Sequence, residues 1–282
     1  MPNYRKQNTY LIKIEGSLHN DIVDIKIFNP KLNSISNKKI NIFRKLSSTD
    51  LKYINIEADI YLLINSEKIH FLHINVDEDS IREISTTEEI SNNPSLCNVN
   101  NKMILFVGGN NSDNILIFDL INDSLYLKGK MNSVRYGAYI IQFNNIIYVC
   151  GGINQENDNT LDVEYFDLNK KYEIKTAKFE NSYLLRKINP FCFEIGSGEM
   201  LLICGGNCLF DKTDTSCFVE PDKLFVQITN ILLPRPFSMH NPNTLSYKGI
   251  FYFYGENENE IFKFSSYHKT FIKIEIEDLV FL

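Results

Sequence analysis

Long apolar segments are absent from this sequence of 282 residues. No run approaches the roughly 20 apolar residues that a membrane-spanning helix needs. The first ten residues, MPNYRKQNTY, lack the apolar core of a secretory signal. The six cysteines show no regular spacing, which fits a compartment that keeps thiols reduced. We therefore expect a cytoplasmic protein without membrane insertion.

Positive charge is also in short supply. The chain has 29 Lys and Arg against 35 Asp and Glu, a net charge of -6, and a pI near 5.5. Phosphate binding needs a basic surface, so we expect no nucleic-acid partner. Only 8 residues are proline and 23% are charged, whereas 44% are apolar, including 15 Tyr and 20 Phe. This composition is typical of a folded globular protein.

Motifs of catalysis and metal binding are missing as well. The chain has no phosphate-binding loop and no two C-x-x-C pairs. His70 and His73 are three residues apart, and in a strand such residues point to opposite faces, which disfavours a shared metal. Cys204, Cys208 and Cys217 resemble a loose cluster, but we interpret them as small apolar core residues. We expect no enzymatic activity, no cofactor and no metal.

The segment from Arg135 to Ile174 contains the clearest structural pattern. Two runs rich in β-branched and aromatic residues, Tyr139 to Phe143 and Ile146 to Cys150, flank the turn residues Asn144-Asn145. The second run ends at Gly151-Gly152, and a third strand, Val163 to Phe166, leads into a fourth. Four short antiparallel strands in about 40 residues predict one blade of a β-propeller.

The same unit recurs along the chain. Strands end at Gly16-Ser17, Asn65-Ser66, Gly108-Gly109, Gly151-Gly152, Gly205-Gly206 and Gly255-Glu256, at intervals of 49, 43, 43, 54 and 50 residues. An eight-residue connection between third and fourth strands follows each marker, and its copies begin at Phe28, Ile74, Phe118, Phe166, Phe218 and Phe264. Two markers that keep the same order six times indicate a sixfold internal repeat.

These features resemble a Kelch repeat: an arginine before the first strand, Gly-Gly after the second, an aromatic-Asp pair closing the third, and a period near 50 residues. The resemblance implies an all-β, six-bladed Kelch-type β-propeller with four antiparallel strands per blade. It implies one domain over residues 1–282, with repeats at approximately 1–46, 47–90, 91–131, 132–178, 179–230 and 231–282. The tryptophan of the Kelch fourth strand is absent, since the chain has no Trp.

The innermost strand of the first blade has two candidates. Either Asn3 to Lys6 supplies this strand, or Leu279 to Leu282 does, which is the usual Kelch way of closing the ring with strands from both ends. The sequence favours neither.

Candidate functional residues lie at two kinds of position. The glycine pairs are expected to take backbone angles that other residues avoid; they are Gly108, Gly109, Gly151, Gly152, Gly205 and Gly206. The Kelch-type arginine appears before three first strands, as Arg135, Arg186 and Arg235, and Lys52 has the comparable place before the second blade. Arginine suits bidentate capture of a carboxylate, which predicts a partner with an acidic segment. Alternatively, each arginine holds its own loop through backbone carbonyls.

Loops are the remaining recognition surface. On the loops after second strands, we expect partner contacts from Asn110, Asn111, Asn154 and Asn207. The predicted function is a non-catalytic protein–protein interaction module and subunit of a hetero-complex, either a structural, cytoskeletal assembly or a ubiquitin-ligase adaptor. The contrasting hypothesis is an enzyme with its site at the channel mouth.

Overall fold

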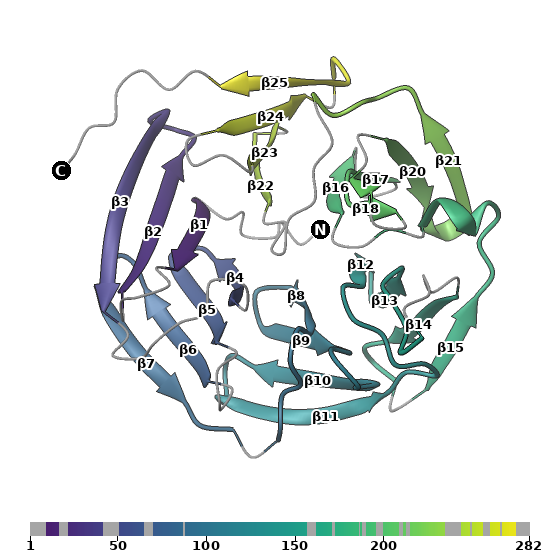
Figure 1. Cartoon of the computed structure of the whole chain (residues 1–282), viewed down its shortest axis with the longest axis horizontal. Helices are drawn as coiled ribbons and strands as arrows, with labels where there is room; N and C mark the ends of the chain where they lie inside the picture. Colours follow the sequence, from purple (N-terminus) through teal and green to yellow (C-terminus); the bar gives the residue numbers. More distant parts are fainter. Residues whose placement is uncertain are drawn as a thin grey trace. The chain divides into compact units, whose positions relative to one another are not determined.

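In the described residues the regular secondary structure is β-strand apart from two short helices (Figure 1). The computed structural model describes residues 10–16, 22–41, 51–64, 70–86, 88–156, 162–170, 173–185, 187, 190–195, 200–208, 211–212, 215–234, 244–248, 250–255, 260–265 and 267–274. In these ranges no helix is long and apolar enough to cross a membrane.

The chain forms two compact units. The first comprises Met1–Thr86, Asn243–Ser265 and Ile272–Leu282, and the second comprises Thr87–Pro242 and Ser266–Phe271. Six antiparallel sheets of three or four strands, each built mainly from consecutive strands, make this an all-β, six-bladed β-propeller, as the repeats predict. We call each sheet a blade and number the blades in chain order.

The first unit contains blades one and two and most of blade six. Blade one is β1 (Leu11–Gly16), β2 (Ile22–Asn29) and β3 (Ser34–Asn41). Blade two is β4 (Leu51–Ile56), β5 (Asp59–Ile64), β6 (His70–Asn75) and β7 (Ser80–Ile84). Blade six is β22 (Thr244–Tyr247), β23 (Ile250–Tyr254), β24 (Ile261–Ser265) and β25 (Thr270–Ile274).

The second unit contains blades three, four and five. Blade three is β8 (Ser95–Val99), β9 (Met103–Val107), β10 (Asn114–Asp119) and β11 (Ser124–Lys130). Blade four is β12 (Tyr139–Phe143), β13 (Ile146–Cys150), β14 (Val163–Asp167) and β15 (Ile174–Ala177). Blade five is β16 (Phe191–Ile195), β17 (Met200–Cys204), β20 (Ser216–Glu220) and β21 (Phe225–Thr229). Blade five is accompanied by the hairpin β18 (Asn207–Cys208) and β19 (Asp211–Lys212) and by the short helices η1 (Ser182–Leu185) and η2 (Pro221–Lys223).

The turn between the third and fourth strands explains the second sequence marker. An Asn or Asp side chain ends the third strand and accepts a hydrogen bond from the backbone N–H two residues later, as in an Asx-turn. The Oδ1 distances are 3.0 Å from Asn29 to Lys31, 3.0 Å from Asn75 to Asp77, 2.8 Å from Asp119 to Ile121 and 2.9 Å from Asp167 to Asn169. The marker therefore encodes a turn as well as a buried residue.

The fifth copy of this marker is displaced by one residue. β20 and β14 share one burial pattern, which aligns Val219 with Phe166. Both of these residues are buried, at 0% and 3% exposure, whereas Phe218 is half-buried. The fifth copy of the marker thus begins at Val219 and not at Phe218. Successive residues of a strand face opposite sides of the sheet, so only Val219 faces the same buried side as Phe166.

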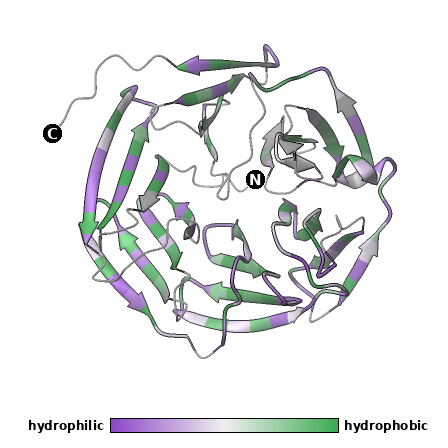
Figure 2. Ribbon diagram, in the orientation of Figure 1, coloured by the Kyte–Doolittle hydropathy of each residue, from purple (hydrophilic) through white to green (hydrophobic). Residues whose placement is uncertain are grey.

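Apolar residues concentrate on second and third strands such as β9 and β10, while outermost strands such as β7 and β11 are more polar (Figure 2). Shared clusters join neighbouring blades. In the first unit, one cluster joins blade one to blade two and another joins blade one to blade six. In the second unit, one cluster joins blades three and four and another joins blades four and five. Each blade therefore completes its core by packing against a neighbour.

Blade one departs from the expected four strands. Among the described residues its sheet has three, ordered β1-β2-β3. Both segments expected to supply its innermost strand, Asn3 to Lys6 and Leu279 to Leu282, lie outside the described residues.

Candidate functional site

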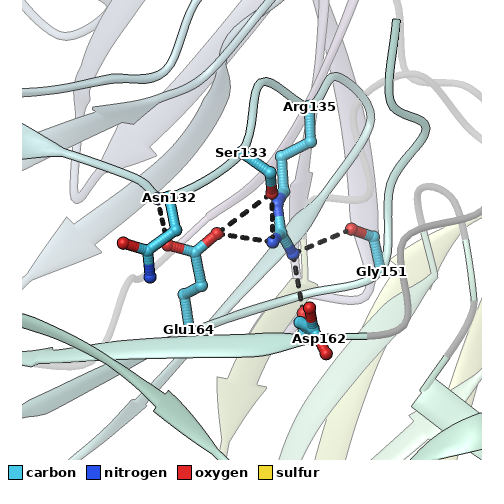
Figure 3. A network of polar contacts seen from close by, with 6 residues as sticks. All are labelled: Asn132, Ser133, Arg135, Gly151, Asp162 and Glu164. Atoms are coloured by element: carbon cyan, nitrogen blue, oxygen red, sulfur yellow. Dashed lines mark hydrogen bonds and ion pairs between the residues drawn. The ribbon is translucent and has the colours of Figure 1, made fainter. Parts of the chain in front are cut away.

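Arg135 lies between β11 and β12 and is fully buried, with an exposed fraction of 0%. Its Nη2 lies 2.6 Å from Oε1 of Glu164 and donates to Oγ of Ser133 at 2.8 Å (Figure 3). Its Nη1 donates to the backbone oxygen of Asp162 at 2.9 Å and lies 3.5 Å from that of Gly151. The guanidinium therefore ties the loop before β12 to the start of β14.

Glu164 completes this network from the opposite side. Its side chain is 2% exposed, and its Oε2 accepts a hydrogen bond from the backbone N–H of Asn132 at 2.6 Å. Its Oε1 also accepts from the hydroxyl of Ser133 at 3.1 Å. A buried ion pair holds together only when hydrogen bonds satisfy both partners, as they largely do here. This arrangement corrects the expected partner contact of Arg135: its side chain supports the loop from inside.

Strand register identifies the same position in blade three. Tyr139 pairs with Cys150, the residue before Gly151, and Arg135 stands four residues before Tyr139. In blade three Ser95 pairs with Val107, the residue before Gly108, so the equivalent position is Ser91. The hydroxyl of Ser91 donates to the backbone oxygen of Gly108.

The equivalent position in blade five is Lys187. Phe191 pairs with Cys204, the residue before Gly205, and Lys187 stands four residues before Phe191. Lys187 is 7% exposed, and its Nζ donates to the backbone oxygens of Gly205 at 3.1 Å and Thr215 at 2.7 Å. Sequence reasoning placed this role on Arg186, which lies outside the described residues. Lys187 lies four residues before Phe191, which pairs with the residue before Gly205. The sequence alone does not give this strand pairing, so it could not identify Lys187.

The glycine pair that follows the second strand of one blade forms a backbone hydrogen bond to Arg135 or Lys187 before the next blade. The backbone N–H of Gly109 donates to the oxygen of Arg135 at 3.0 Å, and that of Gly152 donates to the oxygen of Lys187 at 3.2 Å. All six marker glycines of the second unit have positive φ, at 65°, 113°, 61°, 85°, 68° and 84° in chain order. A Cβ on Gly151 would lie 2.2 Å from the oxygen of Lys187. Both the backbone angle and the available space therefore require glycine.

Lys52 does not share this position, which corrects the sequence expectation. It lies inside β4 and pairs with Leu63, one residue beyond the Leu51–Ile64 pair that corresponds to Tyr139–Cys150. Lys52 is 8% exposed, and burial lowers the pKa of its amino group to about 8. It is therefore a buried strand residue. Arg235, the last of the predicted arginines, lies outside the described residues.

The loops of blades three and four form one hydrogen-bonded surface. We define the polar loop surface as residues 88–94, 109–114, 131–137 and 153–156. Asn110 N–H donates to the oxygen of Asn92 at 2.7 Å. Tyr136 and Ile153 exchange backbone hydrogen bonds of 3.0 and 2.9 Å. Because backbone bonds and the buried Arg135–Glu164 pair hold these loops, their exposed side chains project from a fixed frame.

Amides and carboxylates dominate the exposed side chains of this surface. The exposed members are Glu88, Glu89, Asn92, Asn110, Asn111, Asn132, Gln155 and Glu156. Of the amides expected to contact a partner, Asn110 and Asn111 are exposed and Asn154 is half-buried. The backbone of Asn207 lies in β18, and its side chain is outside the described residues. Sequence reasoning interpreted Asn92 as part of a solvated polar loop and missed Asn132; only the folded loops bring these residues beside Asn110 and Glu164.

The described cysteine side chains of blades four and five pack as apolar residues, whereas the side chain of Cys208 lies outside the described residues. Cys150 and Cys217 share a buried cluster with Tyr139, and Cys192 packs against it. Burial raises the pKa of the Cys150 thiol far above its usual value and that of Cys217 to about 11. Within the described residues, no group of three His, Cys, Asp or Glu side chains could hold a metal ion.

His73 belongs to a local pair in blade two. Its Nε2 lies 2.7 Å from Oδ1 of Asp59, and its ring stacks on Tyr61 with centroids 4.8 Å apart. Asn75 Nδ2 also donates to Oδ1 of Asp59, at 2.8 Å. The carboxylate therefore orients the imidazole within the sheet.

Comparison with protein-family models and with curated proteins finds no match for this chain. The six-bladed β-propeller, its glycine pairs and the buried Arg135 before β12 are compatible with a Kelch-repeat protein.

Proposed function

We propose that this chain is a non-catalytic protein-interaction module, a subunit of a hetero-complex, that recognises its partner through the polar loop surface. The observation that carries this proposal is the rigid frame beneath exposed polar side chains. Arg135 and Glu164 bind the loop to β14, and Gly109 binds the loop of blade three to that of blade four. Loops fixed on a rigid scaffold present side chains with little loss of conformational entropy on binding.

The charge of this surface bears on the partner's chemistry. Arg135 is the one cation within the described part of the polar loop surface, and it is buried. The exposed charges are the carboxylates of Glu88, Glu89 and Glu156. Because Arg135 is buried, it gives no support to the expectation of a partner with an acidic segment. We propose that the partner segment is polar or basic. Complementary charge would speed association at low salt.

The test begins with the native complex. The tagged chain is purified, its co-eluting protein is identified, and binding is measured with both proteins pure. Replacing Asn92, Asn110 and Asn132 together with alanine should weaken binding at least tenfold while the melting temperature stays unchanged, because these side chains are exposed.

The matched control is Asn37→Ala, an exposed amide on β3. Normal binding by the triple variant would place recognition elsewhere. Binding that strengthens as salt increases would contradict the polar or basic partner segment.

A further inference from the structure

The segment that links blade four to blade five lies along the outermost strand of blade five. The backbone N–H of Glu180 donates to the oxygen of Leu224 at 2.8 Å, and the N–H of Val226 donates to the oxygen of Glu180 at 3.1 Å. These two bonds form a parallel bridge between Glu180 and Phe225 of β21. We call residues 179–181 the strap.

The strap covers the side of β21 that faces away from its own sheet. In this sheet β21 follows β20 and is the last strand. Backbone groups of alternate residues in a strand point to the same edge, so the groups of Leu224 and Val226 that bond the strap belong to the edge away from β20. Nδ2 of Asn181 also donates to the oxygen of Val226, at 3.1 Å. Two consecutive residues of the strap therefore satisfy three polar groups of this edge.

Apolar contacts anchor the strap to blade four. Phe179 is 6% exposed, and its ring packs edge-on against that of Tyr148 in β13, with centroids 5.6 Å apart. Leu185 is 1% exposed, and its backbone oxygen accepts a hydrogen bond from the hydroxyl of Tyr139 in β12 at 3.1 Å. Both Phe179 and Leu185 belong to the cluster that joins blades four and five. Blade four therefore holds the segment that covers blade five.

An uncovered outermost strand is a place where another chain can add a strand. Within the described residues, β21 is the one outermost strand that has a backbone partner on its outer side. Glu180 is exposed, so the strap also places a carboxylate at this edge. Charged side chains at an edge disfavour strand addition.

We infer that the strap is an edge cap, which keeps the start of β21 from pairing with a strand of a second copy of this chain. This goes beyond the proposed function, since β21 is not part of the polar loop surface. Because the anchors of the strap lie in blade four, the edge opens only when the contact between blades four and five loosens.

The test uses the purified full-length chain, so that a second copy is the only strand donor present. Glu180→Pro removes the N–H that donates to Leu224 and places the proline ring against that oxygen. Amide hydrogen exchange at Val226 should rise roughly tenfold, the equivalent of one net hydrogen bond. Sedimentation velocity should show self-association that increases with protein concentration.

Asn181→Gly is a milder second variant. The φ angle of Asn181 is 59°, which glycine adopts without strain, so the change removes the amide donor and keeps the turn. Exchange at Val226 should rise by a smaller factor, again with self-association. The matched control is Asn144→Gly, where φ is 52° in a hairpin turn. This control should leave exchange at Val226 and the sedimentation unchanged.

Two outcomes would overturn the inference. Unchanged exchange at Val226 in the strap variants would show that the strap does not hold this edge. Faster exchange without self-association would show that the strap does not keep a second copy from the edge. If Glu180→Pro fails to fold, Asn181→Gly decides the question by the same two measurements.

Discussion

At the scale of single residues, the charged pair in blade four shows why burial decides the role of an arginine. Arg135 has no contact with solvent, and Glu164 supplies its counter-charge. A cation in this setting stabilises the loop that carries it, and it becomes unavailable to a partner. In blade five Lys187 has the position of Arg135, and its amino group donates to the backbone oxygens of Gly205 and Thr215. The strand position equivalent to Glu164 is Cys217, which carries no counter-charge.

We predict that Arg135→Met lowers the free energy of unfolding by about 3–5 kcal/mol, because it leaves Glu164 buried without its cation. The double variant Arg135→Met, Glu164→Leu should be more stable than Arg135→Met alone. Chemical denaturation measures both values. Lys175→Met, which breaks the exposed pair with Glu173, is the control and should hardly change the unfolding midpoint. Equal effects at Arg135 and Lys175 would contradict this account.

At the scale of structural elements, the connections matter as much as the strands. The glycine pairs let one blade's second strand end against the backbone of the next blade's entry loop, through the bonds from Gly109 and Gly152. The outer turns repeat an Asx hydrogen bond, as at Asn75 and Asp119. These connections fix where each strand begins, and so which side chains face the core.

We predict that Gly151→Val and Gly151→Asn are both destabilising, each by more than about 2 kcal/mol. Asparagine tolerates positive φ, but any Cβ here would lie 2.2 Å from the backbone oxygen of Lys187. Thermal melting of the two variants measures the effect. At Asn144, where φ is 52° in a hairpin turn, Asn144→Gly should be tolerated. A stable Gly151→Asn variant would mean that the angle alone selects glycine.

At the scale of the whole molecule, shared clusters make neighbouring blades within a unit depend on one another. The cluster that joins blades four and five contains Cys150 from β13 and Ile203 from β17. Loss of packing in one blade therefore removes contacts from the other, so the two should open together.

We predict that Ile203→Ala destabilises the protein by about 2–5 kcal/mol and exposes Cys150 in the neighbouring blade. Burial raises the pKa of the Cys150 thiol, so little reactive thiolate exists near pH 8 in the native protein. Labelling of Cys150 by a thiol reagent at pH 8 should therefore accelerate in the variant. Acceleration confined to the cysteines of blade five would show that the blades open separately.

Much of the architecture follows from local chemistry. Asn144-Asn145 selects a hairpin turn, and Asp119 and Asp167 select Asx-turns, so short-range rules predict the strands and their sixfold repetition. The prediction was less accurate for blade five, where Val219 replaces Phe218 as the buried residue. Register there depends on which side chain the neighbouring blade covers, and this is not a local property.

The sequence by itself determined the fold class, because the repeating turns and alternating apolar residues act within one blade. Tertiary structure decided the direction of each polar side chain. The sequence around an arginine before a first strand does not distinguish a side chain that faces a partner from one that faces the core. Only folding brings Glu164 beside Arg135, and only folding places Asn181 at the edge of β21. These contacts join distant parts of the sequence, and they give each polar group its role.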